Sequence, residues 1–318
     1  MPARSVREVL RRSPTRAQWD AQRARLDPVV DCTEVFRLVS AHEFPWDMQQ
    51  ALSFALFRTY AVPSIGALLD RTGELTTRTQ KRYEDTGLLL DGALEHGLDT
   101  PRGRTAVRRI NQMHRSYDIA DDDLRYVLAT FVVIPVRWMQ EHGWRPFDEA
   151  ERTASVHYHR KLGALMGIPD LPTTWQGFAD LLDDYERTHF APHPGGRRVA
   201  DATLELLTEL PPQHLLPTWL VRRLALAVMD EPLLDALGYP HQPAALRRAV
   251  RAGLRLRSRV VRRLPPRTEP RWFRQQPAVR GYPDGYDLAA LGTFPRTCPV
   301  PHRRDGEDRT ASEAVQGP

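Results

Sequence analysis

Hydrophobic residues recur every three or four positions along most of this chain, which is the spacing of amphipathic helices. Alternating hydrophobic and polar runs, which would indicate β-strands, are essentially absent. Gly97 follows one helical run, Pro101 opens the next, and acidic residues begin another at Asp121. The pattern predicts an all-α fold with helices at residues 46–60, 63–69, 77–95, 101–117, 121–140, 147–166, 174–188, 199–210, 217–230 and 242–264.

The periodic region predicts one large domain. The chain has 318 residues, 41% of them hydrophobic, enough for a sizeable core. Residues 1–20 and 293–318 lack the periodicity and are predicted to be tails, which leaves residues 21–292 as a single helical domain. The longest apolar stretch, residues 128–136, is about half of the ~20 residues that a membrane span needs. Because no signal peptide is visible either, we expect a cytoplasmic protein.

Charge and cysteine content narrow the function only slightly. The formal net charge is +5, but 40 acidic residues nearly balance the 45 basic ones, so we expect no nucleic-acid partner. Cys32 and Cys298 are the only cysteines, which argues against a disulfide framework or a zinc ribbon. The phosphate-loop, dinucleotide-binding, nucleophile-elbow and HExxH motifs are absent. We interpret two histidine pairs as surface or loop residues rather than metal ligands: His157 with His159, and His189 with His193.

His114 is the most informative single residue. Helical spacing places it on the apolar side of its helix, with Gly103, Val107, Ile110 and Tyr117. Such a histidine is most often a hydrogen-bonded core residue. A neutral imidazole on a buried helix face is also what a haem iron needs as a ligand, and Gly103 would let a flat group come close. The pattern alone leaves both interpretations open.

A polar face precedes this helix. Arg82, Asp85, Thr86 and Leu89 lie on the same side of the helix predicted at residues 77–95. Polar groups that enter an apolar surface need partners, because burying them without compensation is costly. The partner is either a structural contact between Arg82 and Asp85 or a ligand with charges of its own, such as haem propionates or an oxygen species.

Taken in order, these segments resemble the haem-dependent oxygenase family of the latex-clearing protein (rubber oxygenase) and the MpaB-type oxygenases. The resemblance covers roughly residues 40–205, and the C-terminal helices match loosely. It is carried by the Arg82 to Thr86 face and by Phe44-Pro45-Trp46-Asp47, residues 60–69, Thr72-Gly73-Glu74, Ile110-Asn111-Gln112-Met113-His114, residues 131–135, Gly143-Trp144-Arg145, Glu151-Arg152 and residues 162–169.

The resemblance implies a globin-like helical core around haem b, with His114 as the iron ligand and Arg82 and Thr86 on the distal side. Asp85 stands where latex-clearing enzymes carry a lysine that can occupy the sixth iron position. This departure weakens the case for lysine gating and for latex as the substrate. The family's glutamate base matches no single position here, and the candidates are Glu74, Glu84 and Asp85.

The expected activity follows from the same resemblance. It implies that O₂ oxidises or cleaves a C=C bond of an apolar, isoprenoid-type molecule, with hydroxylation or oxidative coupling as other outcomes. Arg82, Asp85 and Thr86 are the expected catalytic residues, with Thr86 donating to bound oxygen and Arg82 steadying a negative charge or a propionate. The alternative is a non-catalytic carrier of haem or an apolar ligand, for which Asp85 is the best support. A nucleic-acid-binding regulator would rest on arginine content alone.

The last long helix, from Gln242 to Leu264, carries eight arginines and no acidic residue. Leu246, Val250, Leu254, Val261 and Leu264 approximate one apolar side. The simplest interpretation is a helix that packs by this side and is solvated on the other. The functional alternatives are contact with an anionic membrane surface or with nucleic acid.

Overall fold

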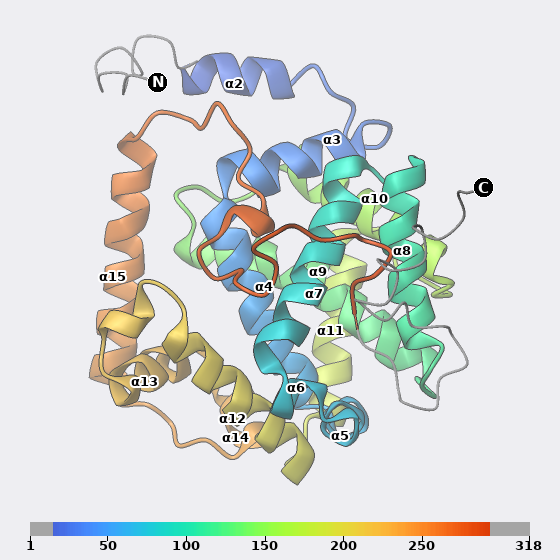
Figure 1. Ribbon diagram of the computed structural model, residues 1–318. Helices are drawn as coiled ribbons and strands as arrows, with labels where there is room; N and C mark the ends of the chain where they lie inside the picture. The colour runs from blue at the N-terminus through green and yellow to red at the C-terminus, as the bar shows by residue number, and fades with distance from the viewer. Residues whose placement is uncertain (1–14, 293–318) are drawn as a thin grey trace, which may run out of the picture.

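The computed structural model describes residues 15–292, which form α-helices and no β-strand (Figure 1). The all-α prediction is therefore confirmed. The tail expected at 293–318, with Cys298, lies outside the described residues, as do residues 1–14. The helices are α2 Arg16–Arg23, α3 Cys32–Arg37, α4 Pro45–Tyr60, α5 Pro63–Thr72, α6 Glu74–Thr77, α7 Thr79–His96, α8 Pro101–His114, α9 Asp121–His142, α10 Glu149–Met166, α11 Trp175–His189, α12 Pro194–Glu209, α13 Thr218–Val228, α14 Glu231–Leu237 and α15 Ala244–Arg263. A π-helical turn spans Leu38–Glu43, and 3₁₀ turns span Gln213–Leu215 and Phe273–Gln275.

Each predicted helix is present, with shifted ends. The largest difference is at α12, which begins at Pro194 rather than at residue 199. Pro194 fits the first turn, and the His193 side chain caps the helix by accepting a hydrogen bond from the Gly195 N–H at 3.1 Å. Helix α8 stops at His114 instead of residue 117. His114 therefore lies in the last helical turn.

Helix α2 was not predicted, because none of its side chains is buried and only Ala17, Trp19 and Ala21 of its eight residues are apolar. It starts with a capping box between Thr15 and Gln18. The Arg16 side chain connects α2 to the end of α15 by donating hydrogen bonds to the carbonyl oxygens of Val261 and Leu264, at 2.9 Å each. The helix runs across residue 20, where the sequence suggests a change from tail to domain.

The core lies between α4 and α9, which pack together at the centre of the molecule. Helices α7 and α8 pair on one side of it, and α5 pairs with α12 on another. The α5–α12 crossing is close because two glycines meet there: a Cβ on Gly66 would lie 2.8 Å from the Gly196 Cα. The apolar stretch 128–136, with Pro135 inside the helix, belongs to α9 and is mostly buried.

Within residues 15–292, no single helix has the length and composition of a membrane span. The bent pair α4 and α5 passes the same test together, with a 99° change of direction between them. Both helices contribute buried residues to the core.

After α15, residues 265–292 form a C-terminal strap that crosses the outer side of α7 (orange to red in Figure 1). The Glu84 carboxylate accepts backbone N–H groups from Arg280 at 2.6 Å and Gly281 at 3.0 Å. Asp91 accepts the Phe273 N–H at 3.0 Å, and the Phe273 ring packs directly over Gly87. The strap is thus fixed along most of the length of α7.

Candidate functional site

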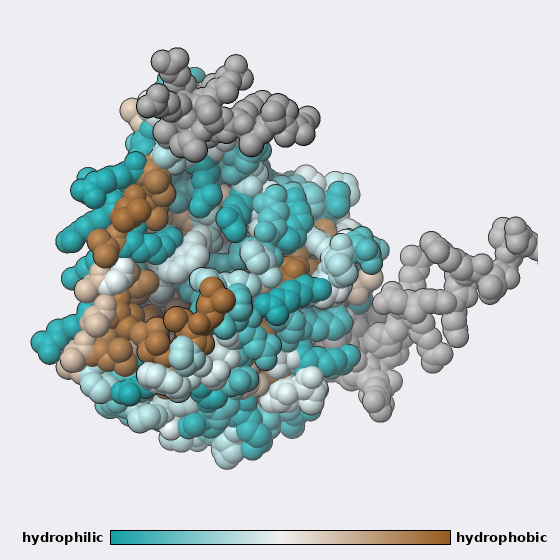
Figure 2. Space-filling view, turned by 60° about the vertical axis from the view of Figure 1, so that its left-hand side comes forward, coloured by the Kyte–Doolittle hydropathy of each residue, from teal (hydrophilic) through white to brown (hydrophobic). Residues whose placement is uncertain are grey.

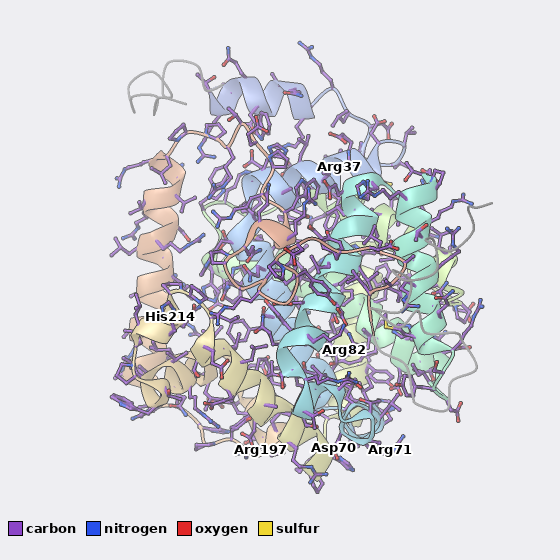
Figure 3. All side chains as sticks on the ribbon, in the orientation of Figure 1. Arg37, Asp70, Arg71, Arg82, Arg197 and His214 are labelled. Carbon is purple, nitrogen blue, oxygen red and sulfur yellow. The ribbon has the colours of Figure 1, made fainter. Side chains whose placement is uncertain are left out.

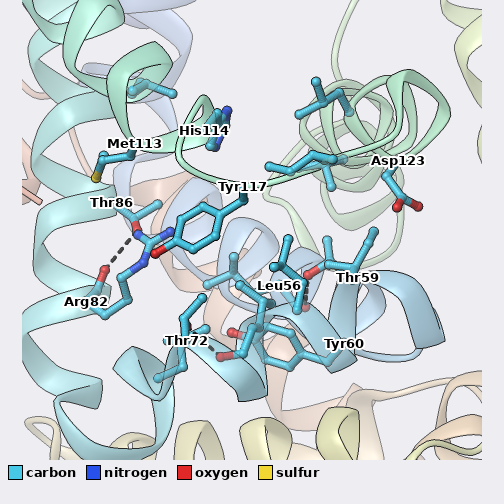
Figure 4. A pocket seen from close by; sticks show the side chains of 18 of the residues that line it. Leu56, Thr59, Tyr60, Thr72, Arg82, Thr86, Met113, His114, Tyr117 and Asp123 are labelled. Carbon is cyan, nitrogen blue, oxygen red and sulfur yellow. Dashed lines mark hydrogen bonds between the residues drawn. The ribbon is translucent and has the colours of Figure 1, made fainter. Parts of the chain in front are cut away.

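A cavity of about 540 Å³ lies between α5, α7, α8 and α9, with a largely apolar wall. Its volume is in the range of small-molecule and cofactor sites. Arg71 and Asp118 belong to the lining and are exposed, so the cavity reaches the surface beside them. The residues singled out from the sequence that line it include His114, Arg82 and Thr86 (Figure 4).

His114 lies in the last turn of α8, and its imidazole faces this cavity. Burial, together with the nearby positive charge of Arg82, lowers the pKa of His114 to about 4. The ring is therefore neutral at physiological pH. Within residues 15–292, neither ring nitrogen makes a hydrogen bond, which sets His114 apart from an ordinary buried core histidine. A neutral, unpaired imidazole is able to ligate a metal.

Arg82 reaches the cavity from α7, on the other helix of the α7–α8 pair (Figures 3 and 4). In the view of Figure 3 it lies away from the edge of the molecule, whereas Arg71 and Arg197 lie at the lower edge. Its guanidinium donates to the Thr86 hydroxyl, and that hydroxyl donates to the Arg82 carbonyl oxygen at 2.8 Å. The Thr86 proton is already engaged, which differs from the expected role as a donor to bound oxygen.

Asp85 does not line the cavity, although the helical spacing placed it on the same side as Arg82. Its carboxylate is fully buried on the strap side of α7. There it pairs with Lys81 at 2.8 Å and accepts a hydrogen bond from the Tyr282 hydroxyl. The contact between Arg82 and Asp85 considered above is therefore absent, because each side chain has a different partner.

Glu74 is the one candidate for the family's glutamate base that lines the cavity. One carboxylate oxygen pairs with Arg78, and the other is buried with no hydrogen-bond partner in the structure. Glu84, by contrast, is engaged with the backbone of the strap and with Gln80. An unpartnered carboxylate oxygen at a cavity wall is available to accept a proton or to bind a donor.

A second cavity of about 160 Å³ adjoins the first and was not predicted. The two share the wall residues Leu56, Tyr83, Thr86, Leu90, Phe131 and Leu162. Burial raises the pKa of Asp91, which lines the second cavity, to about 7. His159 also lines it and is buried, so its interpretation as a surface or loop histidine is wrong. Burial lowers the pKa of His159 to about 4, and its Nδ1 bonds to the Ser155 carbonyl at 2.8 Å.

Gly103 has a structural role rather than the predicted one. It does not line the cavity. Gly103 lies in the first turn of α8, and a Cβ there would collide with the carbonyl oxygen of Gly97, which follows α7. Among the described residues, no group of three or more His, Cys, Asp or Glu side chains could hold a metal ion. A metal in this site would therefore depend on His114 and on ligands that come with a cofactor.

Residues 47–263 match the family described as "ER-bound oxygenase mpaB/B'/Rubber oxygenase, catalytic domain". The resemblance deduced from the sequence is thus confirmed and extends through α15. ER-bound oxygenase mpaB of Penicillium brevicompactum is 32% identical over 222 residues, which is 64% of this chain and 56% of the relative. Its mpaB' is 36% identical over 188 residues, 53% of this chain and 44% of that relative. The mpaB of Penicillium roqueforti (strain FM164) is 36% identical over 188 residues, 53% of this chain and 63% of that relative. The chain spans about half the length of these relatives.

Proposed function

Because this chain belongs to the mpaB and rubber oxygenase catalytic-domain family, we propose that it is a haem b-dependent oxygenase. It uses O₂ to oxidise or cleave a C=C bond of an apolar, isoprenoid-type molecule. The observation that carries the proposal is a neutral, unpaired His114 imidazole facing a 540 Å³ apolar cavity, with an arginine on the neighbouring helix.

The residues present fit a haem. His114 would offer a neutral nitrogen to the haem iron, and the apolar wall, which includes Leu89 and Ile110, would suit the apolar surface of the cofactor. The guanidinium of Arg82 suits a propionate or a developing negative charge. When bound, haem supplies the iron at which O₂ is activated. Cleavage of the alkene would place one oxygen atom of O₂ on each carbon of the former double bond.

Residues of the chain itself orient the groups at the site, accept a proton and exclude water. Thr86 orients Arg82, and the free Glu74 oxygen accepts a proton at the cavity wall. Asp85 does not touch the substrate. It binds Lys81 and Tyr282 and so holds α7 against the strap. The apolar lining excludes water and favours a substrate without charge. A cytoplasmic location stays a prediction, since the relatives carry "ER-bound" in their names.

The test is the visible absorption spectrum of the protein purified after expression with haem supplied. We expect a Soret band in the wild type and its loss or shift in His114→Ala. His159→Ala is the matched control, because it removes another buried neutral histidine that does not line the large cavity. A colourless wild type that stays colourless after haem is added would overturn the proposal.

The alternative is a haem or apolar-ligand carrier without catalysis. It is favoured by the position of Asp85, whose carboxylate is held away from the cavity where latex-clearing enzymes have a lysine able to reach iron. Oxygen consumption in the presence of unsaturated isoprenoids separates the two functions. Haem retention with no substrate-dependent oxygen uptake across such a panel would favour the carrier.

A further inference from the structure

Several large hydrophobic side chains lie exposed on the side of the molecule formed by α13 and α15. Figure 2 shows them as a brown band that runs along α15 and broadens at one end, with hydrophilic residues beside it. Leu256, which is 60% exposed, belongs to the band, and we count with it Trp219 of α13, which is 62% exposed and is not drawn in brown on this hydropathy scale. The other large exposed members are Leu215, Leu216, Val260 and Leu264. We call these six residues the apolar band.

Helix α15 has two apolar sides, of which the sequence pattern revealed one. The predicted side is confirmed for Leu246, Val250, Leu254 and Val261, which are partly buried against the domain, but not for Leu264, which is 54% exposed. Arg257 strengthens this side by pairing with the buried Asp47 at 2.9 Å. Leu256 and Val260 lie on a neighbouring side of the helix and extend into solvent. Because packing is already provided by the inner side, the outer leucine and valine have no role in holding the helix to the domain.

A row of arginines borders the apolar band. It consists of Arg248, Arg255, Arg259, Arg262 and Arg263, all exposed. Across residues 15–292, no carboxylate forms an ion pair with any of these five, whereas Arg251 pairs with Glu141 at 3.0 Å. Helix α15 itself carries no acidic residue. The surface therefore presents unneutralised positive charge next to exposed hydrocarbon.

We propose that the apolar band and its arginine row dock the protein on the surface of an anionic lipid bilayer. Exposed leucine, valine and tryptophan side chains enter the boundary between headgroups and acyl chains, while the arginines contact lipid phosphates. A second copy of the chain is a poorer fit, since a symmetric contact would bring two arginine rows together. Nucleic acid would use the arginines but would leave the apolar band in water.

The test is co-sedimentation of the full chain with vesicles, either of phosphatidylcholine alone or of equal parts phosphatidylcholine and phosphatidylglycerol. We expect pelleting with the anionic vesicles only, and weaker pelleting at high salt. Replacing Leu256→Ser together with Val260→Ser should weaken partitioning by about tenfold, through lost apolar contact. Arg255→Gln together with Arg259→Gln should weaken it by a similar ~10-fold or more.

Matched controls come from other exposed positions. Val29→Ser with Val30→Ser removes two exposed valines from the loop before α3, and Arg102→Gln with Arg104→Gln removes two exposed arginines from α8. Both should leave vesicle binding unchanged. Absence of pelleting with anionic vesicles would overturn the proposal, as would equal effects of band and control variants. A dimer that Leu256→Ser disrupts, or duplex DNA binding without vesicle binding, would assign the surface to another partner.

Discussion

Thr86 contacts Arg82 twice. Its hydroxyl accepts a hydrogen bond from the Arg82 guanidinium and donates one to the Arg82 carbonyl oxygen at 2.8 Å. One hydroxyl one helical turn away thus fixes the direction in which the guanidinium enters the cavity. We regard Thr86 as a positioning residue for Arg82 rather than as a group that meets the substrate.

This relationship predicts different outcomes for two substitutions of Thr86. Thr86→Val keeps the shape but removes the hydroxyl, so we expect about tenfold lower turnover and a stability loss of ~1 kcal/mol, with haem retained. Thr86→Ser keeps the hydroxyl and should remain within about twofold of the wild type. Soret absorbance and oxygen uptake per haem measure these effects. Normal turnover in Thr86→Val would show that the orientation of Arg82 does not matter.

Glu74 should affect turnover without affecting cofactor retention. Its unpartnered oxygen lies at the cavity wall, so Glu74→Gln removes a proton acceptor while preserving size. We expect turnover to fall by about a hundredfold with an unchanged Soret band. Arg78→Gln is the control, because it removes the ion-pair partner of Glu74 and leaves the carboxylate in place. If both variants lost activity equally, the ion pair and not the free oxygen would be responsible.

The fit of the strap against α7 predicts a contrast between two glycines. A methyl group on Gly87 would collide with the Phe273 ring, so Gly87→Ala should destabilise the protein by about 1–3 kcal/mol. Gly253 lies in α15 with nothing within 4 Å of its added Cβ. Gly253→Ala should therefore stabilise by up to about 1 kcal/mol, through helix propensity. Urea unfolding followed by circular dichroism measures both, and equal shifts would contradict a tightly packed strap.

Asp91 should make stability depend on pH. Burial raises its pKa to about 7 from an ordinary value of 3.8, so the folded state holds a proton that the unfolded state has released. The stabilising contribution of this protonation is complete below about pH 4 and is lost as the pH rises through about 7. Asp91→Asn can still accept the Phe273 N–H and should be about 1–3 kcal/mol more stable than the wild type at pH 8. The difference should shrink towards pH 5.

The measurement for Asp91 is urea unfolding at pH 5 and pH 8. The exposed Asp99, which pairs with Lys161, supplies the control: Asp99→Asn should show no such pH-dependent gain. A gain of the same size at both pH values would mean that Asp91 is ionised in the folded protein at pH 5.

The helices and the position of His114 could be predicted because both depend on local spacing. The orientation of Asp85 could not. It lies three residues from Arg82, on a side of α7 that borders both the large cavity and the C-terminal strap. Helical spacing shows which residues share this side but not which of them face the cavity and which face the strap. The strap, whose Tyr282 binds Asp85, has little regular structure, so its sequence shows no hydrophobic periodicity from which its position could be predicted. Helix α2 could not be predicted for a related reason. Polar contacts from Arg16 and Arg23 hold it in place, and such contacts leave no hydrophobic pattern in the sequence.

The C-terminal strap links the site to the order in which the chain is synthesised. Arg280, whose backbone N–H binds the Glu84 carboxylate, follows Glu84 by 196 residues. Until that segment leaves the ribosome, the Glu84 and Asp85 carboxylates have only Gln80 and Lys81 of their own helix as partners and stay hydrated. The second cavity also lacks the wall supplied by Trp272 and Phe273 during this time. A nascent chain would thus acquire its helices early and its complete cavities only after the strap has been synthesised, so the proposed cofactor would be captured after that point.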